Sequence, residues 1–122
     1  MGTFNVKCTV SNHTRRERKI EIPGILVDTG SEHTWISEPL LKKIGVVPEK
    51  KDVRFIMANG QTISRDVGFA IIYVGGVFTI DEIVFARPGD LQLLGARSLE
   101  GLNLVVDSRR KKLVAAGPFP AA

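Results

Sequence analysis

An aspartate followed by threonine and glycine is the strongest candidate for chemistry in this chain. Residues 25–31 read Ile-Leu-Val-Asp-Thr-Gly-Ser, so an apolar strand runs directly into Asp28. We expect the apolar run to carry Asp28 toward the interior, where a carboxylate is costly unless it is hydrogen-bonded or protonated. Gly30 permits a sharp turn whose backbone amides face the carboxylate, and the Thr29 hydroxyl can bind a neighbouring backbone group. The pattern predicts an acid held rigidly at the base of a cleft, or, in the simpler alternative, a strand that ends in an Asp turn.

Two further segments accompany this acid turn along the chain. About thirty residues later, Asn59-Gly60 predicts a tight hairpin turn between a strand at 53–58 and a returning strand at 62–64. Residues 91–95, Leu-Gln-Leu-Leu-Gly, form an apolar strand that ends on glycine, and a short helix at 97–102 follows. The order is therefore acid turn, hairpin, apolar strand with glycine, and helix.

The elements that position these segments are mostly strands, because apolar and polar residues alternate with period two along much of the chain. Pro23-Gly24 is expected to interrupt the second strand, and Gly75-Gly76 predicts another hairpin turn. Strands are predicted at residues 4–10, 20–22, 25–27, 53–58, 62–64, 67–73, 77–85, 104–107 and 113–115.

Only one other helix is predicted besides that at 97–102. Ser37 can cap it, Pro39 suits its first turn, and Gly45 ends it. Many short strands with two short helices predict an all-β fold, a closed barrel or sandwich, formed by one domain over residues 1–122.

Composition excludes several other classes of function. The single cysteine, Cys8, excludes an internal disulfide and is expected in the core, and one cysteine with two histidines makes no zinc cluster, so we expect no metal or other cofactor. The net charge is only +4, and the basic run 109–112 is typical of a solvated turn, so no nucleic-acid partner is expected. No serine or cysteine lies in a nucleophile motif, and no glycine-rich phosphate loop is present. Without a signal peptide or an apolar span, we expect a soluble cytoplasmic protein with no membrane partner.

Three motifs together resemble the retropepsin-like aspartic proteases, the retroviral-type family with small bacterial and archaeal members. They are LVDTGSEHTWI at 26–36, FIMANGQTIS at 55–64 and LQLLGARSLEGLNLVVD at 91–107, and the resemblance runs from about Phe4 to Ala115. The resemblance implies a closed barrel-like fold, a homodimer, and hydrolysis of peptide bonds in a polypeptide substrate by two aspartates, one from each chain.

The resemblance also implies roles for individual residues. Asp28 matches the catalytic acid, Thr29 the threonine whose hydroxyl locks the two active-site loops across the dimer, and Gly30 the loop glycine that contacts the substrate backbone. The hairpin residues match the flap that closes over the peptide, and three others lie where the family lines its side-chain subsites. The flap residues are Ile56, Met57, Ala58, Asn59 and Gly60, and the subsite residues are His33, Leu91 and Leu93. Thr34 and Ile36 match core positions after the acid loop, and Trp35 is expected to pack there.

The sequence departs from the retroviral pattern after Gly95. An arginine directly follows this glycine in retroviral members, whereas here Ala96 follows it and Arg97 comes one residue later. A shifted ion pair between Glu32 and Arg97 is therefore expected to replace the family contact. The last hairpin, 104–115, and the tail after it extend beyond the retroviral pattern, so the dimer interface is expected to differ there.

Two carboxyl groups are needed for this chemistry, yet the chain holds one Asp-Thr-Gly. One carboxylate takes a proton from water while a neutral carboxyl polarises the scissile carbonyl. A two-fold axis must therefore bring Asp28 beside its copy. The alternative is a peptide-binding or dimerisation module of the same fold that lacks effective turnover. A third, weaker hypothesis is that the basic clusters guide acidic partners.

Overall fold

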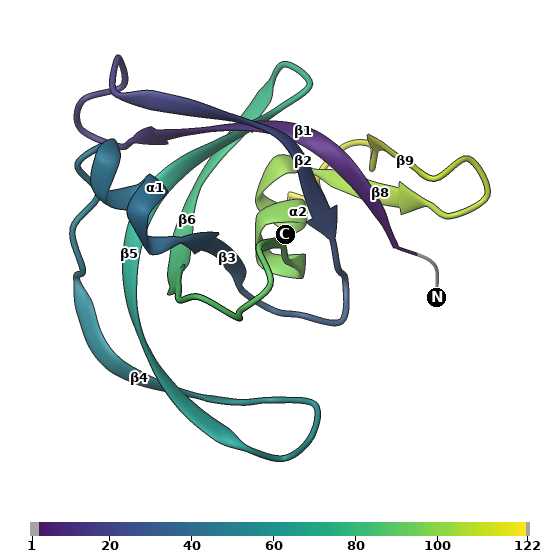
Figure 1. Cartoon of the computed structure of the whole chain (residues 1–122). Helices are drawn as coiled ribbons and strands as arrows, with labels where there is room; N and C mark the ends of the chain where they lie inside the picture. The colour runs from purple at the N-terminus through teal and green to yellow at the C-terminus, as the bar shows by residue number, and fades with distance from the viewer. Residues whose placement is uncertain (1–2, 122) are drawn as a thin grey trace.

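The structure is a computed structural model that describes residues 3–121, and over these residues the chain is mostly β with two short helices (Figure 1). The predicted all-β class with two helices is therefore confirmed. None of the helices in residues 3–121 is long and apolar enough to cross a membrane. In chain order the elements are β1 (Phe4–Asn12), β2 (Lys19–Val27), β3 (Thr34–Ser37), α1 (Glu38–Lys43), β4 (Lys50–Ile56), β5 (Thr62–Val74), β6 (Val77–Ala86), β7 (Leu93–Leu94), α2 (Ala96–Leu102), β8 (Leu104–Asp107) and β9 (Lys112–Ala115).

Seven of these strands form one sheet in the order β1-β2-β7-β3-β6-β5-β4, and β8 and β9 pair separately. The short strand β7 lies between β2 and β3, parallel to β2 and antiparallel to β3. β3 runs parallel to β6 in a register that sets Thr34 opposite Ile83. The segments before and after these central strands, which include Asp28 and Gly95, are thereby brought to one region of the sheet.

The prediction of a closed barrel is wrong. The sheet curls until β1 also pairs with β5 over residues 9–12, but a barrel needs continuous ladders between all neighbouring strands. β7 has only two residues, and a single pair, Trp35 with Leu93, joins it to β3. β4 lies at the end of the strand order, and the β4–β5 hairpin projects from the rest of the sheet (Figure 1).

The predicted interruption at Pro23-Gly24 is absent, because β2 continues through it to Val27. The register between β1 and β2 shifts here, so that Lys7 alone lies opposite both Pro23 and Gly24. A β-bulge of this kind accommodates a proline that cannot donate a ladder hydrogen bond. The predicted break is therefore a bulge within one long strand.

The turns and helix ends follow the sequence in most respects. Gly75 and Gly76 both adopt positive φ, as a two-residue hairpin turn requires, between Val74 and Val77. Ser37 occupies the N-cap position of α1, but its side chain makes no capping hydrogen bond. α2 begins at Ala96, one residue before the predicted start.

The core has two parts. The larger part includes Cys8, which is 2% exposed, together with Ile36 and Leu94. The smaller part packs the base of the β4–β5 hairpin against β3 and β7. Its buried residues are Trp35, Val67, Val84, Ala86 and Leu93, with Leu26, Val53, Phe55 and Ile63 packed against them. The predicted core positions Thr34, Trp35 and Ile36 are all buried, which confirms that prediction.

Candidate active site

Asp28 lies directly after β2, in the loop 28–33 that leads to β3; we call this segment the Asp28 loop. The Asp28 N–H donates to the Leu94 carbonyl oxygen at 3.0 Å, and the Gly30 N–H donates to Asp28 Oδ1 at 2.9 Å. The Ser31 N–H donates to the Asp28 carbonyl oxygen at 3.2 Å. The carboxyl group is thus held by a backbone amide, as expected from the glycine two residues later. Asp28 is half-buried in the single chain rather than fully buried, while Thr29 and Gly30 are exposed.

The start of α2 packs directly on the backbone of the Asp28 loop. The Ala96 N–H donates to the Ser31 carbonyl oxygen at 2.8 Å, and the Arg97 N–H donates to the Glu32 carbonyl oxygen at 3.0 Å. A Cβ atom at Gly95 would lie 2.3 Å from the carbonyl oxygen of His33, which no real contact allows. A glycine is therefore required at position 95, because only a residue without a side chain lets the start of α2 pack this closely on the loop.

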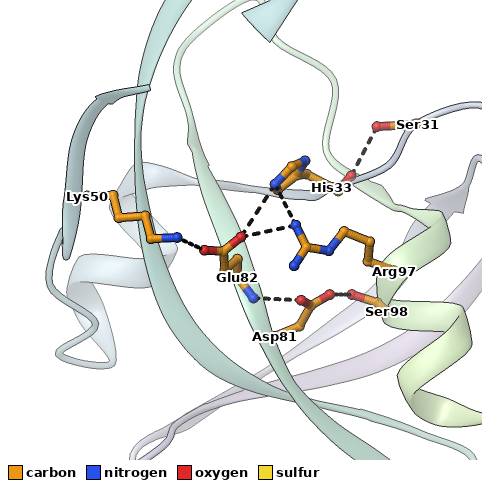
Figure 2. Close-up of polar contacts among 7 residues, drawn as sticks. All are labelled: Ser31, His33, Lys50, Asp81, Glu82, Arg97 and Ser98. Atoms are coloured by element: carbon orange, nitrogen blue, oxygen red, sulfur yellow. Dashed lines mark hydrogen bonds and ion pairs between the residues drawn. The ribbon is translucent and has the colours of Figure 1, made fainter. Parts of the chain in front are cut away.

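A buried chain of hydroxyl groups also connects α2 to the sheet. The Gly95 N–H donates to Thr34 Oγ1 at 3.0 Å, and the Ser98 hydroxyl donates to Asp81 Oδ2 at 2.8 Å (Figure 2). The hydroxyls of Thr34 and Ser98 lie 2.6 Å apart. Because Ser98 uses its proton on Asp81, Thr34 must donate to Ser98, so every group in this chain has one defined role.

Glu82 of β6 is the centre of an ionic cluster that the sequence did not reveal (Figure 2). Its carboxylate binds Lys50 Nζ at the start of β4, Arg97 Nη1 at 3.1 Å and His33 Nε2 at 3.6 Å. The pKa of Glu82 lies below its usual value, chiefly because of the hydrogen bond from Lys50, with further attraction from Arg97 and His33 and partial opposition from burial. The parallel register of β3 and β6 explains the approach, since it sets His33 level with Glu82.

The predicted ion pair between Glu32 and Arg97 does not form. The Arg97 side chain instead contacts Glu82 and His33, and only its backbone N–H reaches Glu32, at the carbonyl oxygen. The arginine lies in the first turn of α2, whose direction carries its side chain toward β6 (Figure 2). Helix direction, which sequence spacing alone does not supply, thus decides the partner.

The predicted flap is the tip of the hairpin formed by β4 and the start of β5; we call residues 50–64 the 50–64 hairpin. The Gly60 N–H donates to the Met57 carbonyl oxygen at 2.9 Å, and the Met57 N–H donates to the Gln61 carbonyl oxygen at 2.8 Å. Gly60 alone in this turn has positive φ, +86°, so the connection is a three-residue loop with a glycine bulge. The predicted flap residues, Ile56, Met57, Ala58, Asn59 and Gly60, are all exposed.

The predicted subsite residues lie in different environments. The His33 ring meets the Phe55 ring edge-on, with centroids 5.3 Å apart, so His33 touches the 50–64 hairpin as well as Glu82. Leu91 is 67% exposed, whereas Leu93 is buried in the smaller part of the core. The Leu91 side chain is therefore exposed, the His33 side chain is half-buried, and the Leu93 side chain packs in the core.

A second ion pair lies next to the 50–64 hairpin. Arg65, the residue of β5 that directly follows the hairpin, donates from Nε to Asp90 Oδ2 at 2.7 Å and from Nη2 to Asp90 Oδ1 at 2.9 Å. The Arg87 N–H also donates to Asp90 Oδ2, at 2.8 Å. The hydrogen bonds from Arg65 hold the pKa of Asp90 below its usual value. The pair connects the hairpin base to the loop that carries Leu91.

One sequence signal could have identified Asp81 and Glu82, which were not among the predicted site residues. Asp81 and Glu82 stand together in a strand that is otherwise mostly apolar, and charges in such a position need partners. Residues 3–121 contain no group of three or more His, Cys, Asp or Glu side chains arranged to hold a metal ion.

Comparison with known proteins bears on the family. No curated protein matches the sequence. A sequence profile of a family described as aspartyl protease matches residues 7–98, which is 92 of the 122 residues. The matched region includes the Asp28 loop, the 50–64 hairpin and Gly95, while β8 and β9 lie beyond it. Three quarters of the chain thus follow one family pattern, and the chain belongs to the aspartyl protease family, among its retropepsin-like members.

Proposed function

We propose that the protein is a homodimeric aspartic endopeptidase in which the two Asp28 side chains share one proton. The observation that carries the proposal is the Asp28 loop: a half-buried carboxyl held by the Gly30 amide, next to two exposed residues, within a family of proteases. A carboxyl group in this setting is oriented by the backbone and still open to a second molecule.

The dimer is part of the proposal because one chain supplies one Asp-Thr-Gly. A two-fold axis beside the exposed edge of the Asp28 loop brings the two carboxyls together. Like charges a few ångströms apart resist joint ionisation, so the pair keeps one proton and titrates as a unit.

Hydrolysis then proceeds by acid–base catalysis. The charged carboxyl takes a proton from a water molecule, whose oxygen attacks the scissile carbonyl carbon, while the neutral carboxyl donates its proton to the carbonyl oxygen. When the tetrahedral intermediate collapses, one of its hydroxyl groups returns a proton to the dyad as the carbonyl re-forms. The C–N bond breaks, the leaving nitrogen takes up the other proton of the dyad, and the dyad again holds one proton. The net change is the addition of one water molecule across the peptide bond.

The 50–64 hairpin is proposed to cover the bound peptide. Its tip is exposed, with Ile56 79% exposed, and offers apolar contact to an extended chain. His33 at the end of the Asp28 loop and the exposed Leu91 are proposed to contact substrate side chains. Peptides in extended conformation bind such a site through their backbone.

The test is hydrolysis of unstructured polypeptides over acidic to neutral pH by wild-type protein and by Asp28→Asn. We expect cleavage by the wild type, inhibition by a statine-type peptide, and no cleavage by the variant. Specific activity should also rise with protein concentration over the range in which the dimer forms. The concentration at half-maximal activity should equal the concentration at which analytical ultracentrifugation shows half of the protein as dimer. Cleavage that survives Asp28→Asn, or that comes from a monomer, contradicts the proposal.

A second candidate function is peptide binding without turnover. The observation that favours it is the position of β4 at the end of the strand order, where an extended segment can add to the sheet. This function predicts saturable binding of peptides that are never cleaved, with an affinity that Asp28→Asn leaves unchanged.

A further inference from the structure

The Glu82 carboxylate is the point where three separate segments meet. Lys50 comes from the start of the 50–64 hairpin, His33 from the Asp28 loop, and Arg97 from the first turn of α2 (Figure 2). The Glu82 side chain is 14% exposed, whereas Lys50 and Arg97 are 55% and 44% exposed. The acid is thus the sheltered centre of the cluster, and its partners approach from the surface.

The chemistry of the cluster makes Glu82 the one group that holds these partners together. Lys50 and Arg97 carry like charges and have no attraction for each other without an anion between them. Arg97 Nη1 donates both to His33 Nε2 and to Glu82 Oε2, each at 3.1 Å, so Arg97 joins His33 to the carboxylate. Replacing the carboxylate by a neutral amide of nearly the same shape removes the negative charge that attracts Lys50 and Arg97, and with it the support for the contact of Arg97 with His33.

The backbone of Glu82 is itself anchored. Its N–H donates to Asp81 Oδ1 at 2.7 Å, and Asp81 accepts the Ser98 hydroxyl. The strand on which Glu82 stands is paired on both sides, with β3 and β5. The carboxylate therefore has a fixed position on the sheet, and the 50–64 hairpin can be placed relative to it.

We propose that Glu82 is a positioning residue that sets the 50–64 hairpin in register with the Asp28 loop through Lys50 and His33. The inference rests on the proposed function in taking this hairpin as the cover of the bound peptide. Two of the contacts between this hairpin and the Asp28 loop are the ionic one through Glu82 and the ring contact of His33 with Phe55. Loss of the ionic contact leaves the ring contact in place but removes the charged connection.

The expected effect on catalysis is selective. Glu82→Gln should lower kcat/KM about tenfold, because misplacement of a substrate-covering element weakens substrate and transition state alike. We expect this fall to come mostly from a higher KM, with a matching loss of affinity for a statine-type peptide. The value of kcat should change little, because the contacts of Asp28 with Gly30 and Leu94 remain. A merely structural role would lower the amount of folded enzyme and leave KM unchanged.

Amide hydrogen exchange of the unliganded protein provides a readout that needs no activity. In Glu82→Gln, the amides of residues 50–64 should exchange several times faster, and those of β1 and β2 should keep the wild-type rate. Lys50→Met, at a side chain that is 55% exposed, should give the same local pattern and remains informative where Glu82→Gln fails to fold. Glu21→Gln removes the exposed ion pair with Lys7 and is the matched control, which should change neither KM nor exchange at 50–64.

These readouts test the proposed peptidase function and the positioning role of Glu82 separately. A wild type without peptidase activity contradicts the proposed function, and the exchange experiment then still decides the role of Glu82. Exchange at 50–64 that equals the wild-type rate in both Glu82→Gln and Lys50→Met overturns the positioning role. An increase spread evenly over the whole chain overturns it as well, since it identifies a general stabilising role.

Discussion

Thr34 and Ser98 are 64 residues apart in sequence, and their hydroxyl oxygens share a buried hydrogen bond of 2.6 Å. This bond joins the first residue of β3 to the first turn of α2, close to the contact between Gly95 and the Asp28 loop. The geometry of the candidate active site therefore depends on hydroxyl groups that are fully buried and lie outside the Asp-Thr-Gly motif.

Thr34→Val should destabilise the protein by about 2 kcal/mol, because it leaves the Gly95 N–H without its acceptor and Ser98 without its donor in a buried site. Urea unfolding followed by fluorescence of Trp35 measures this. Thr62→Val, at an exposed strand position, is the control and should stay within about 0.5 kcal/mol of the wild type. Equal stability of the two variants would contradict the assigned hydrogen-bond chain.

Gly95→Ala should be severely destabilising, by about 3 kcal/mol, because the added Cβ would meet the His33 carbonyl at 2.3 Å and force α2 away from the Asp28 loop. Thermal unfolding and cleavage assays should both report the loss. Gly24→Ala is a matched control: its Cβ would meet Asn5 at an ordinary 3.5 Å, and we expect a change below about 0.5 kcal/mol. A well-folded, fully active Gly95→Ala variant would refute the spatial requirement.

Asp90→Asn should reduce stability by about 2 kcal/mol at neutral pH, because the charged hydrogen bonds to Arg65 are weakened. The pKa of Asp90 is lower in the folded state than its usual value of 3.8, so the unfolded chain binds the proton more readily. The contribution is therefore complete above pH 3.8 and is lost as the pH falls through the lower folded-state pKa.

Urea unfolding of the wild type and Asp90→Asn at about pH 7 and about pH 2.5 tests this dependence. The difference between the two proteins should shrink at the lower pH. Glu21→Gln, which removes an exposed pair, should differ little from the wild type at neutral pH. A difference between wild type and Asp90→Asn that is constant with pH would show that the ion pair is not its source.

Cys8 should be inert toward thiol reagents in the native protein. It is 2% exposed on β1, and burial raises the pKa of its thiol to about 12, so almost no thiolate is present near neutral pH. Reaction with an aromatic disulfide reagent should be negligible in buffer and complete in urea. Rapid reaction in buffer would contradict the core position of this residue.

The parts of the fold that could be predicted are those decided locally. Turn chemistry located the hairpins, since Gly60, Gly75 and Gly76 adopt the positive φ values that only glycine takes readily. The run of apolar residues into Asp28 located the acid loop, and the glycine after it supplies the amide that binds the carboxyl. Period-two alternation identified most strands to within a few residues.

The parts that could not be predicted depend on which strands become neighbours. Glu82 meets His33 because β3 and β6 pair in parallel, and no sequence pattern here specifies that register. The burial of Leu93 likewise follows from β7 pairing on both sides, which the sequence pattern does not specify, while its predicted contact with substrate stays a prediction. The prediction of a closed barrel is wrong because β7 has only two residues, which are too few to complete a ladder between β2 and β3.

The place between β2 and β3 in the large sheet is filled by the last strand of that sheet in the sequence, β7. During synthesis β2 and β3 must therefore wait, with an open slot between them, until residues 93 and 94 leave the ribosome. The carbonyl of Leu94 that binds the Asp28 amide arrives with them. A nascent chain that stops before this point has the aspartate but lacks the carbonyl that accepts from its amide, so the Asp28 loop cannot assemble until residue 94 is available.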